Sequence, residues 1–147
     1  MRRRWKWLLA VGVVLFVGWC ALGYEVSKFI VRPRNSSIGA RADLGGVPVQ
    51  NVTITAEDNV KISAWFAPGK QPDRAVILAA GIDANRGALV SRGEFYLARG
   101  YAVLLPDLRG TGESDATPVT IGWEERKDIL ACLKFLKDRG YTHVGAD

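Results

Sequence analysis

Hydrophobic and polar residues follow three different patterns along the chain, and each predicts a different element. Residues 7–24, WLLAVGVVLFVGWCALGY, form an apolar run without a formal charge. Residues 51–68 alternate between apolar and polar positions on both sides of Asp58-Asn59, which predicts a β-hairpin with its turn at that pair. Unbroken apolar runs at 75–80 (AVILAA) and 101–106 (YAVLLP) predict strands covered on both faces, as in a parallel sheet.

Helical periodicity separates these predicted strands. Residues 85–100 predict a helix that ends at Gly100, and residues 122–140 predict a longer one that ends at Gly140. A third strand is expected to begin at THVGA, residues 142–146. Strand, helix, strand, helix and strand with short links predict a right-handed parallel α/β sheet, preceded by the antiparallel hairpin.

The apolar run near the N-terminus predicts a membrane-spanning helix. Residues 5–24 reach about 20 residues, the length needed to cross a hydrocarbon core of about 30 Å, and are expected to contact membrane lipid. The basic cluster MRRRWK outweighs the basic residues that follow the run, so the N-terminus is predicted to stay in the cytoplasm and the rest to be exported. Aromatic residues stand near both ends of the run, where such rings prefer to lie: Trp5, Trp7, Trp19 and Tyr24.

A cleaved signal peptide is the alternative interpretation of the same run. The small residues of ALG make a cleavage site near Gly23 conceivable, and the protein would then be secreted. In either case residues 1–25 are an anchor or signal peptide, and residues 26–50, rich in Pro, Gly, Arg and Ser, are predicted to be a linker and lead-in. Residues 51–147 are predicted to form a partial α/β domain.

The distribution of charge argues against a nucleic-acid partner. The net charge is +5, but the first 34 residues hold seven basic residues and one acidic residue, which leaves 13 basic and 14 acidic residues for the rest. A nucleic-acid-binding domain carries its basic excess on the folded body. The two cysteines, Cys20 and Cys132, lie in the apolar run and on a predicted helix, so they are expected to be apolar filler and not a disulfide.

A glycine-rich turn follows the second buried strand and is the most specific motif in the chain. It has the pattern D-x-R-G-x-G-x-S, and its members are Asp107, Arg109, Gly110, Gly112 and Ser114. The glycines allow a tight reversal at the strand end, and Asp107 and Arg109 are predicted to pair and hold it. An ordinary structural turn explains the pattern about equally well.

From about Ala42 to Asp147 the sequence resembles the α/β-hydrolase fold family, in its membrane-anchored or secreted serine-hydrolase branch, which includes esterases, acyl hydrolases and serine aminopeptidases. The resemblance is carried by these segments: DLGGVPVQNVTITAEDNVKISAWFAP, AVILAAGIDANRG, LARGYAVLLPDLRGTGES and EERKDILACLKFLKDRGY. It implies the first half of an α/β-hydrolase sheet. It also implies hydrolysis of an ester, thioester, lipid or peptide by the complete protein, without metal or cofactor; the oligomeric state is not predicted.

The resemblance also implies an oxyanion loop after the first buried strand. The family usually has His-Gly-x there, and the matching residues are Ala80, Gly81 and Ile82. The backbone N–H of Ile82, next to Gly81, is the expected oxyanion donor. Ala80 replaces the usual His and removes its side-chain support.

The family's nucleophile elbow, G-x-S-x-G, follows the next strand, so the nucleophilic Ser is expected just after Asp147, with the acid and the His later still. No catalytic group is therefore expected within residues 1–147. Ser114 lies too far beyond its strand and precedes no helix, although GESDA nearly matches the elbow. His143 precedes any plausible nucleophile and is expected to be a packed or edge histidine.

Two other classes of function remain open from the residues. A membrane-tethered α/β binding module without catalysis, a pseudo-hydrolase, would show the same elements. A nucleotide-binding domain would show strand, Gly81, helix, strand and then Asp107 as its ribose-binding acid. Asp83 argues against the nucleotide because it stands where a second glycine must let the pyrophosphate approach.

Overall fold

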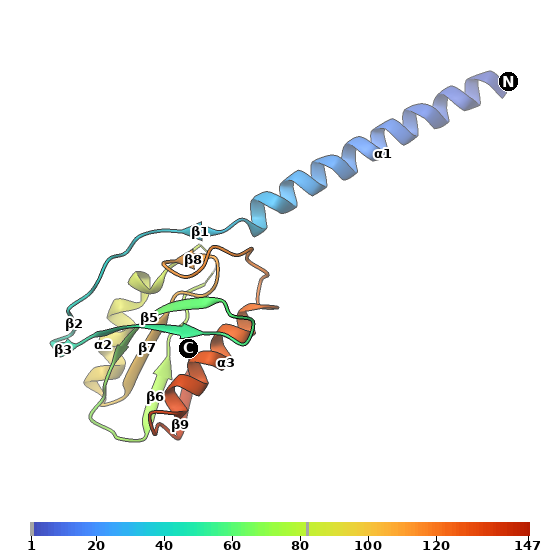
Figure 1. Ribbon diagram of the computed structural model, residues 1–147. Coiled ribbons are helices and arrows are strands. Elements are labelled where there is room, and N and C mark those ends of the chain that lie inside the picture. The colour runs from blue at the N-terminus through green and yellow to red at the C-terminus, as the bar shows by residue number, and fades with distance from the viewer. Residues whose placement is uncertain (1, 82) are drawn as a thin grey trace. The chain divides into compact units, whose positions relative to one another are not determined.

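The computed structural model describes residues 2–81 and 83–147, which form two units. One is the helix α1, Arg2–Val31, and the other is a domain that begins at Pro33 and reaches Asp147 (Figure 1). The domain therefore starts earlier than the predicted boundary at residue 51, because the lead-in is part of it.

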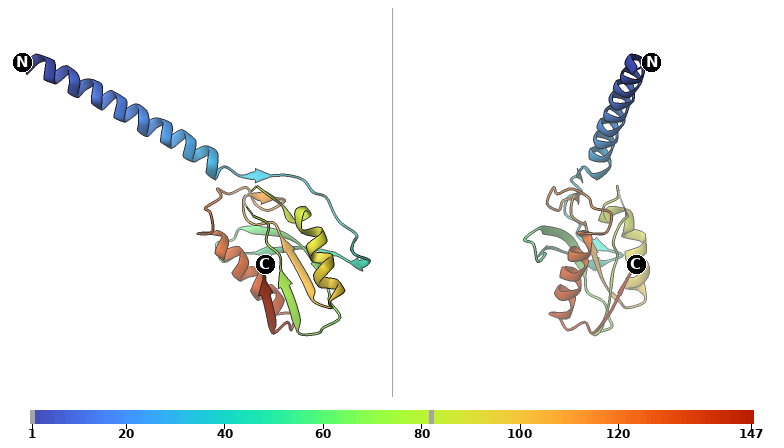
Figure 2. Two further views of the ribbon diagram at one scale, coloured as in Figure 1. Left: turned by 180° about the vertical axis from the view of Figure 1, so that it is seen from behind. Right: turned by 90° about the vertical axis from the view of Figure 1, so that its right-hand side faces the viewer.

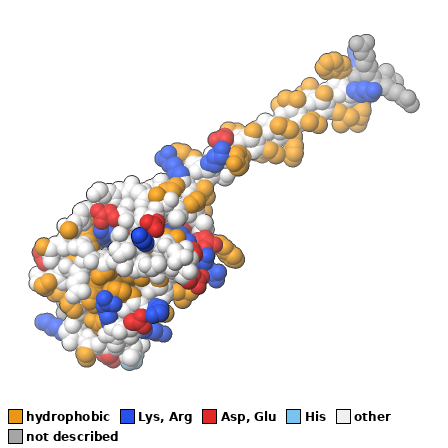
Figure 3. Space-filling view, viewed as in Figure 1, with side chains coloured by type: hydrophobic (Ala, Val, Ile, Leu, Met, Phe, Trp, Pro, Cys, Tyr) orange, Lys and Arg blue, Asp and Glu red, His pale blue; other side chains and the backbone are white. Residues whose placement is uncertain are grey.

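Helix α1 has 30 residues and, at 1.5 Å per residue, a length of about 45 Å. Hydrophobic side chains line it along its length (Figure 3). It is long and apolar enough to cross a membrane, although a signal sequence would meet the same criteria. The helix continues past Tyr24 to Val31, so the prediction of a linker from residue 26 is wrong for its first residues.

The domain is built on one five-stranded sheet with the order β4-β5-β7-β6-β9. The hairpin β4–β5 is antiparallel, β5 pairs antiparallel with β7, and β6 pairs parallel with both β7 and β9. The predicted hairpin followed by a parallel sheet is thus confirmed. The strands are β4 (Gln50–Thr55), β5 (Lys61–Ala67), β6 (Arg74–Ile77), β7 (Ala102–Pro106) and β9 (His143–Ala146).

The helices of the domain cover opposite faces of this sheet (Figure 2). On one face the short 3-10 helix η1 (Arg86–Leu89) leads into α2 (Val90–Ala98). On the other face lies α3 (Glu125–Lys137), which buries Cys132 and Leu136 against β5, β6 and β7. Cys132 is thus the apolar filler that the sequence predicts.

Positive φ angles stand where the sequence places turns and helix ends. Asn59 in the hairpin turn has a φ of 66°, and Gly100 and Gly140 behind the two helices have φ angles of 87° and 91°. Strand β6 ends at Ile77, three residues before the predicted end, although the N–H groups of Leu78 and Ala79 still donate to Leu104 and Asp147. The left-handed positions therefore mark element ends more sharply than the apolar runs do.

From Arg34 onward, the segment predicted to be a linker and lead-in is docked on the domain. Strand β1 (Arg34–Asn35) pairs parallel with β8 (Thr111–Gly112), and β2 (Asp43–Leu44) pairs antiparallel with β3 (Val47–Pro48). Leu44 has no exposed surface and packs among the core residues on the α2 side. Such short strands show no periodicity, which is why the pattern did not predict them.

Candidate functional site

Three segments meet at the carboxyl edge of the parallel strands. They are the loop after β6, which starts at Leu78, the loop after β7, which starts at Asp107, and Asp147, which follows β9. The backbone N–H of Asp147 donates to the carbonyl of Ile77 at 3.0 Å, and the N–H of Ala79 donates to the carbonyl of Asp147 at 3.1 Å. Ligands of open α/β sheets bind outside this edge, so it is the candidate functional site.

Asp107 organises the loop after β7. Its carboxylate is buried, accepts the backbone N–H of Arg86 at 2.7 Å and that of Glu113 at 2.9 Å, and forms an ion pair with the Arg86 guanidinium. Arg86 also pairs with Glu113, and its guanidinium carbon lies 4.8 Å from the centroid of a Trp65 ring. A buried carboxylate without such partners would cost several kcal/mol. Asp107 thus ties η1 to both sides of the loop.

The two glycines of the motif are required by this packing. Gly112 has a φ of 49°, and a Cβ at this position would lie 2.0 Å from Oδ2 of Asp107. Gly110 has a φ of 72°, and a Cβ there would lie 2.3 Å from the carbonyl oxygen of Thr117. Any other residue would displace backbone or a buried carboxylate, so these glycines hold the shape of the loop.

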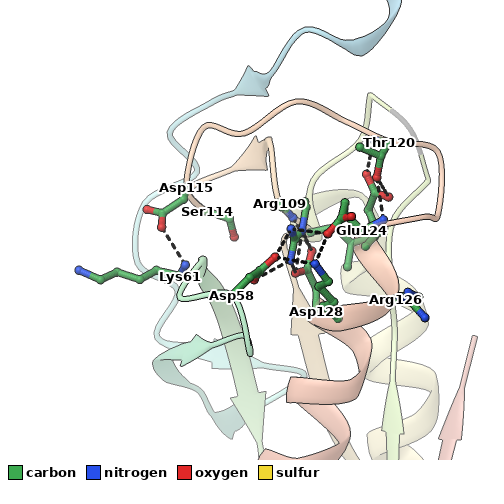
Figure 4. Close-up of polar contacts among 12 residues, drawn as sticks. Asp58, Lys61, Arg109, Ser114, Asp115, Thr120, Glu124, Arg126 and Asp128 are labelled. Carbon is green, nitrogen blue, oxygen red and sulfur yellow. Dashed lines mark hydrogen bonds and ion pairs between the residues drawn. The ribbon is translucent and has the colours of Figure 1, made fainter.

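The predicted pair between Asp107 and Arg109 is wrong. The Arg109 guanidinium points toward the start of α3, where its Nη2 lies 2.8 Å from Oδ1 of Asp128 and its Nη1 lies 2.7 Å from Oδ2 of Asp58 (Figure 4). Its backbone N–H also donates to Asp128, at 2.9 Å. The reason for the difference is Arg86, which already pairs with the carboxylate of Asp107. The loop is therefore braced by two separate arginine clusters.

Ser114, the last member of the motif, is buried and has a structural position. Its Oγ donates to the carbonyl of Asp107 at 2.6 Å and accepts the backbone N–H of Ser63 at 2.9 Å. The hydroxyl thus connects the loop after β7 to strand β5, which explains why a serine stands here.

The loop after β6 has more open surroundings. Ile82, the predicted oxyanion donor, lies outside the described residues, while Ala80 and Gly81 line a pocket of about 170 Å³. A Cβ at Gly81 would meet no atom within 4 Å. Asp83 has a φ of 71° and forms an ion pair with Arg34. One end of this loop is thus tied down, and the other faces free space.

The opposite wall of the pocket comes from the loop after β7 and from the segment before α3, including Val119, Ile121 and Glu125. The Glu125 carboxylate is buried and accepts the N–H and the hydroxyl of Thr120, each at 2.7 Å, and the N–H of Gly122 at 2.8 Å. Burial opposes ionisation of Glu125, but the hydrogen bonds from Thr120 and Gly122 outweigh it and lower the pKa. The pocket is therefore walled mainly by apolar side chains, with Arg109, Thr111 and Glu125 as its polar residues.

Two further carboxylates near this edge are held ionised. The backbone N–H groups of Gly39, at 2.9 Å, and Ile38, at 3.0 Å, together with the Arg86 guanidinium, lower the pKa of Glu113 to about 2. Hydrogen bonds from Arg109 and then Lys127 hold the pKa of Asp58 well below its usual range, against a smaller opposing effect of burial. Both carboxylates act as anionic ties between the loop after β7 and neighbouring segments.

Sequence reasoning did not find several members of the two clusters, namely Arg86, Glu113, Asp58, Asp128 and Glu125. For one of them, the sequence pattern did indicate a buried polar role. Asp128 stands four residues before Cys132 and eight before Leu136, on the buried face of α3, and has no exposed surface. A charge on the apolar face of a helix indicates a buried partner, which here is Arg109.

His143 lies on β9, the last strand in the sheet order, and its side chain is exposed. Its Nδ1 lies 3.0 Å from a carboxylate oxygen of Asp73. This is an edge position, as predicted, and at the start of β9 it is remote from the carboxyl edge. Within residues 2–81 and 83–147 no group of three His, Cys, Asp or Glu side chains is arranged to hold a metal ion.

Solved structures give the clearest comparison, since no family model and no curated protein sequence matches the chain. The chain is similar to the esterase Pf2001 of Pyrococcus furiosus, with 32% identity and a TM-score of 0.71 over 79% of this chain and 47% of that one. It is similar to the esterase EaEST of Exiguobacterium antarcticum, with 26% identity and a TM-score of 0.56 over 66% of this chain and 34% of that one.

A third structure, the α/β hydrolase GrgF of a Penicillium species, shares 23% identity and a TM-score of 0.58 over 63% of this chain and 33% of that one. At this identity the similarity shows the fold alone. The chain spans about half the length, or less, of each structure named here.

Proposed function

The chain belongs to the α/β-hydrolase fold family, and on this premise we propose that it provides the oxyanion-loop half of the catalytic domain of a membrane-anchored serine hydrolase. The substrate class is an ester, thioester, lipid or peptide, and the reaction is transfer of an acyl group to water. The similarity to the esterases of Pyrococcus furiosus and Exiguobacterium antarcticum supports ester hydrolysis first.

One observation carries this proposal, which is the position of Asp147. Its backbone exchanges hydrogen bonds with Ile77 and Ala79, so the residues that follow Asp147 start beside the loop that contains Gly81. A serine at an elbow in those residues would stand next to backbone donors of that loop. One such donor to a developing oxyanion contributes about 3 kcal/mol of transition-state stabilisation.

The residues of this chain then have two kinds of role. Gly81 and the backbone N–H of Ile82 bind the oxyanion, and the pocket of about 170 Å³ beside Gly81 receives part of the substrate. The clusters around Arg86 and Arg109 hold the neighbouring loop in place and do not touch the reacting atoms. The nucleophile, the acid and the general base come from residues after Asp147.

Helix α1 serves as the membrane anchor in this proposal. Its length, its apolar composition and the basic residues that precede its apolar run support an anchor with a cytoplasmic N-terminus and an exported domain. A cleaved leader is the alternative. Detection of a polypeptide that starts near Tyr24 in the mature protein would favour the leader over the anchor.

The test is labelling of the protein expressed from its gene with a fluorophosphonate, which reacts with activated serines. We expect labelling at a serine within a G-x-S-x-G that follows Asp147, and equal labelling of a Ser114→Ala variant. A chain of residues 1–147 is the matched control and should not react. The proposal is overturned if the gene encodes no such serine, or if the label is found on Ser114. If the protein binds an ester but is not labelled, a non-catalytic binding module is favoured instead.

A further inference from the structure

The segment before α3 exposes two large apolar side chains. We name residues 117–124 the rim loop, because Val119, Ile121 and Gly122 line the candidate pocket. Ile121 is 65% exposed and Trp123 is 69% exposed. Single exposed apolar residues are common, but these two stand on one turn, and Ile121 also lines the pocket. Their exposure therefore calls for a physical reason.

The backbone at Ile121 is strained. Its φ is 54°, in the left-handed region that β-branched residues rarely adopt, and such a conformation costs about 1–3 kcal/mol. The Glu125 carboxylate holds this conformation, since it accepts hydrogen bonds from Thr120 on one side of Ile121 and from Gly122 on the other. The loop is thus locked in a form that presents Ile121 to the surroundings.

One basic side chain packs against Trp123. The Arg126 guanidinium carbon lies 5.3 Å from the centroid of a Trp123 ring, and its Nε donates to the Trp123 carbonyl at 3.1 Å. An exposed tryptophan beside an arginine matches the chemistry of a lipid headgroup layer, where aromatic rings settle and cations meet anionic lipid.

Few residues separate the end of α1 from the wall of the pocket along the chain. Helix α1 ends at Val31, and Arg34 already pairs with Thr111, which lines the same pocket as Ile121. The three residues from Val31 to Arg34 span at most about 11 Å. The pocket wall is therefore fastened to the chain within a few residues of the proposed membrane span.

From these observations we infer that the rim loop is a membrane-contact surface that holds the mouth of the pocket at the lipid interface, where water-insoluble esters would enter. Ile121 and Trp123 insert among the headgroups, and Arg126 binds anionic lipid. This inference rests on the proposed anchoring by α1. The competing occupant is a later part of the same chain folded over the loop.

The test places a fluorophore at single positions of the full-length protein. Ile121→Cys and Trp123→Cys are prepared in a background without other exposed cysteines, with Cys20→Ala, and are labelled with a nitrobenzoxadiazole dye. Lys70→Cys, exposed in the turn between β5 and β6 at the opposite end of the sheet, and Leu130→Cys, exposed on α3 beyond the rim loop, are the matched controls. The protein is reconstituted in phosphatidylcholine–phosphatidylglycerol vesicles with or without a nitroxide lipid.

We expect the dye at 121 and 123 to lose most of its fluorescence with the nitroxide lipid, while the dye at 70 and 130 keeps its fluorescence. Equal quenching at all four positions, or none at 121 and 123, overturns the inference. Emission at 121 and 123 that is already blue-shifted in detergent and insensitive to the nitroxide identifies a covering chain segment and also overturns it.

A kinetic measurement separates this inference from the proposed function. The variant Trp123→Asp, at a residue outside the pocket lining, should hydrolyse a vesicle-embedded ester more slowly than the parent, with unchanged turnover of a short soluble ester. Equal loss on both esters contradicts a role in delivery. If the parent hydrolyses neither ester, the proposed function fails, while selective quenching at 121 and 123 would still establish the membrane contact.

Discussion

The loops after β6 and β7 stand side by side at one edge of the sheet and are built in opposite ways. In the loop after β7, Asp107, Arg109 and Ser114 are all buried, and each forms hydrogen bonds with other parts of the domain. In the loop after β6, Ala80 and Gly81 face a pocket, and a Cβ at Gly81 would meet nothing. One loop is internally satisfied, and the other leaves room for a ligand.

This difference assigns the two motifs to different tasks. A group that must meet a substrate keeps its hydrogen-bonding capacity free until the substrate arrives. A group whose donors and acceptors are already matched inside the protein can only hold shape. The more recognisable motif, D-x-R-G-x-G-x-S, is therefore the scaffold, and the plainer sequence after β6 is the candidate for chemistry.

The largest effect is expected from Asp107→Asn in the full-length protein. The change leaves the buried Arg86 guanidinium without its main partner, and loss of one member of a buried ion pair costs about 3–5 kcal/mol. The melting temperature should fall accordingly. Asp115→Asn is the control, because Asp115 is exposed and its hydrogen bond to the Lys61 N–H survives the change. If the two variants have the same melting temperature, the scaffold role of Asp107 is contradicted.

Gly112→Ala is expected to come next. The added Cβ would stand 2.0 Å from Oδ2 of Asp107, at a φ of 49°, and overpacking of this kind costs about 1–3 kcal/mol. Thermal unfolding and the rate of proteolysis near the loop measure the effect. If the Gly112→Ala variant has the same melting temperature as the parent protein, the contact with Asp107 does not constrain the fold.

Acid should loosen the loop after β7 through Glu113. Its pKa in the folded protein is about 2, below the ordinary value of 4.5. The hydrogen bonds from the Gly39 and Ile38 N–H groups, together with the ion pair with Arg86, therefore stabilise the fold above pH 4.5, and this stabilisation is lost as the pH falls toward 2. Glu113→Gln should melt at a lower temperature than the parent at neutral pH, and its melting temperature should change less over this acid range. Parallel profiles for the two proteins would exclude Glu113 as an acid-sensitive tie.

The smallest effect on stability is expected from Gly81→Ala. Its Cβ enters open space and its φ lies outside the left-handed region, so the free energy of unfolding should change by about 0.5 kcal/mol or less. Hydrolysis by the full-length protein is the more sensitive measurement, because the new methyl group would enter the pocket. A large loss of stability would show that this loop is as tightly packed as its neighbour.

The fold was largely predictable because its elements are periodic or bounded by glycine. The unbroken apolar runs gave β6 and β7, the apolar face with Leu133 and Leu136 gave α3, and Gly100 and Gly140 marked the helix ends. The end of β6 and the start of α3 were predicted less precisely. Leu78 and Ala79 still donate to Leu104 and Asp147 beyond the end of β6, and the start of α3 is set by helical backbone hydrogen bonds. Hydrophobicity alone reports neither boundary.

The side-chain partners were not predictable in the same way. Asp107 and Arg109 are close in sequence and of opposite charge, yet Asp107 pairs with Arg86 and Arg109 pairs with Asp58 and Asp128. Oppositely charged residues are numerous in this chain, and only the three-dimensional path of the backbone decides which of them meet. The docked lead-in escaped prediction for a related reason, since Glu113 binds the backbone of Ile38 and Gly39 whatever their side chains are.

The pairing of β1 with β8 has a consequence for how the protein could be shed. Within the described residues, the hydrogen bonds that fasten the lead-in to the domain lie at Arg34 or later in the chain, well beyond Gly23. A peptidase that cut near Gly23 would leave these hydrogen bonds intact. The released fragment would keep its folded body together with the last turns of α1, from Tyr24 to Val31, so such a cut would change where the domain is located and not its architecture.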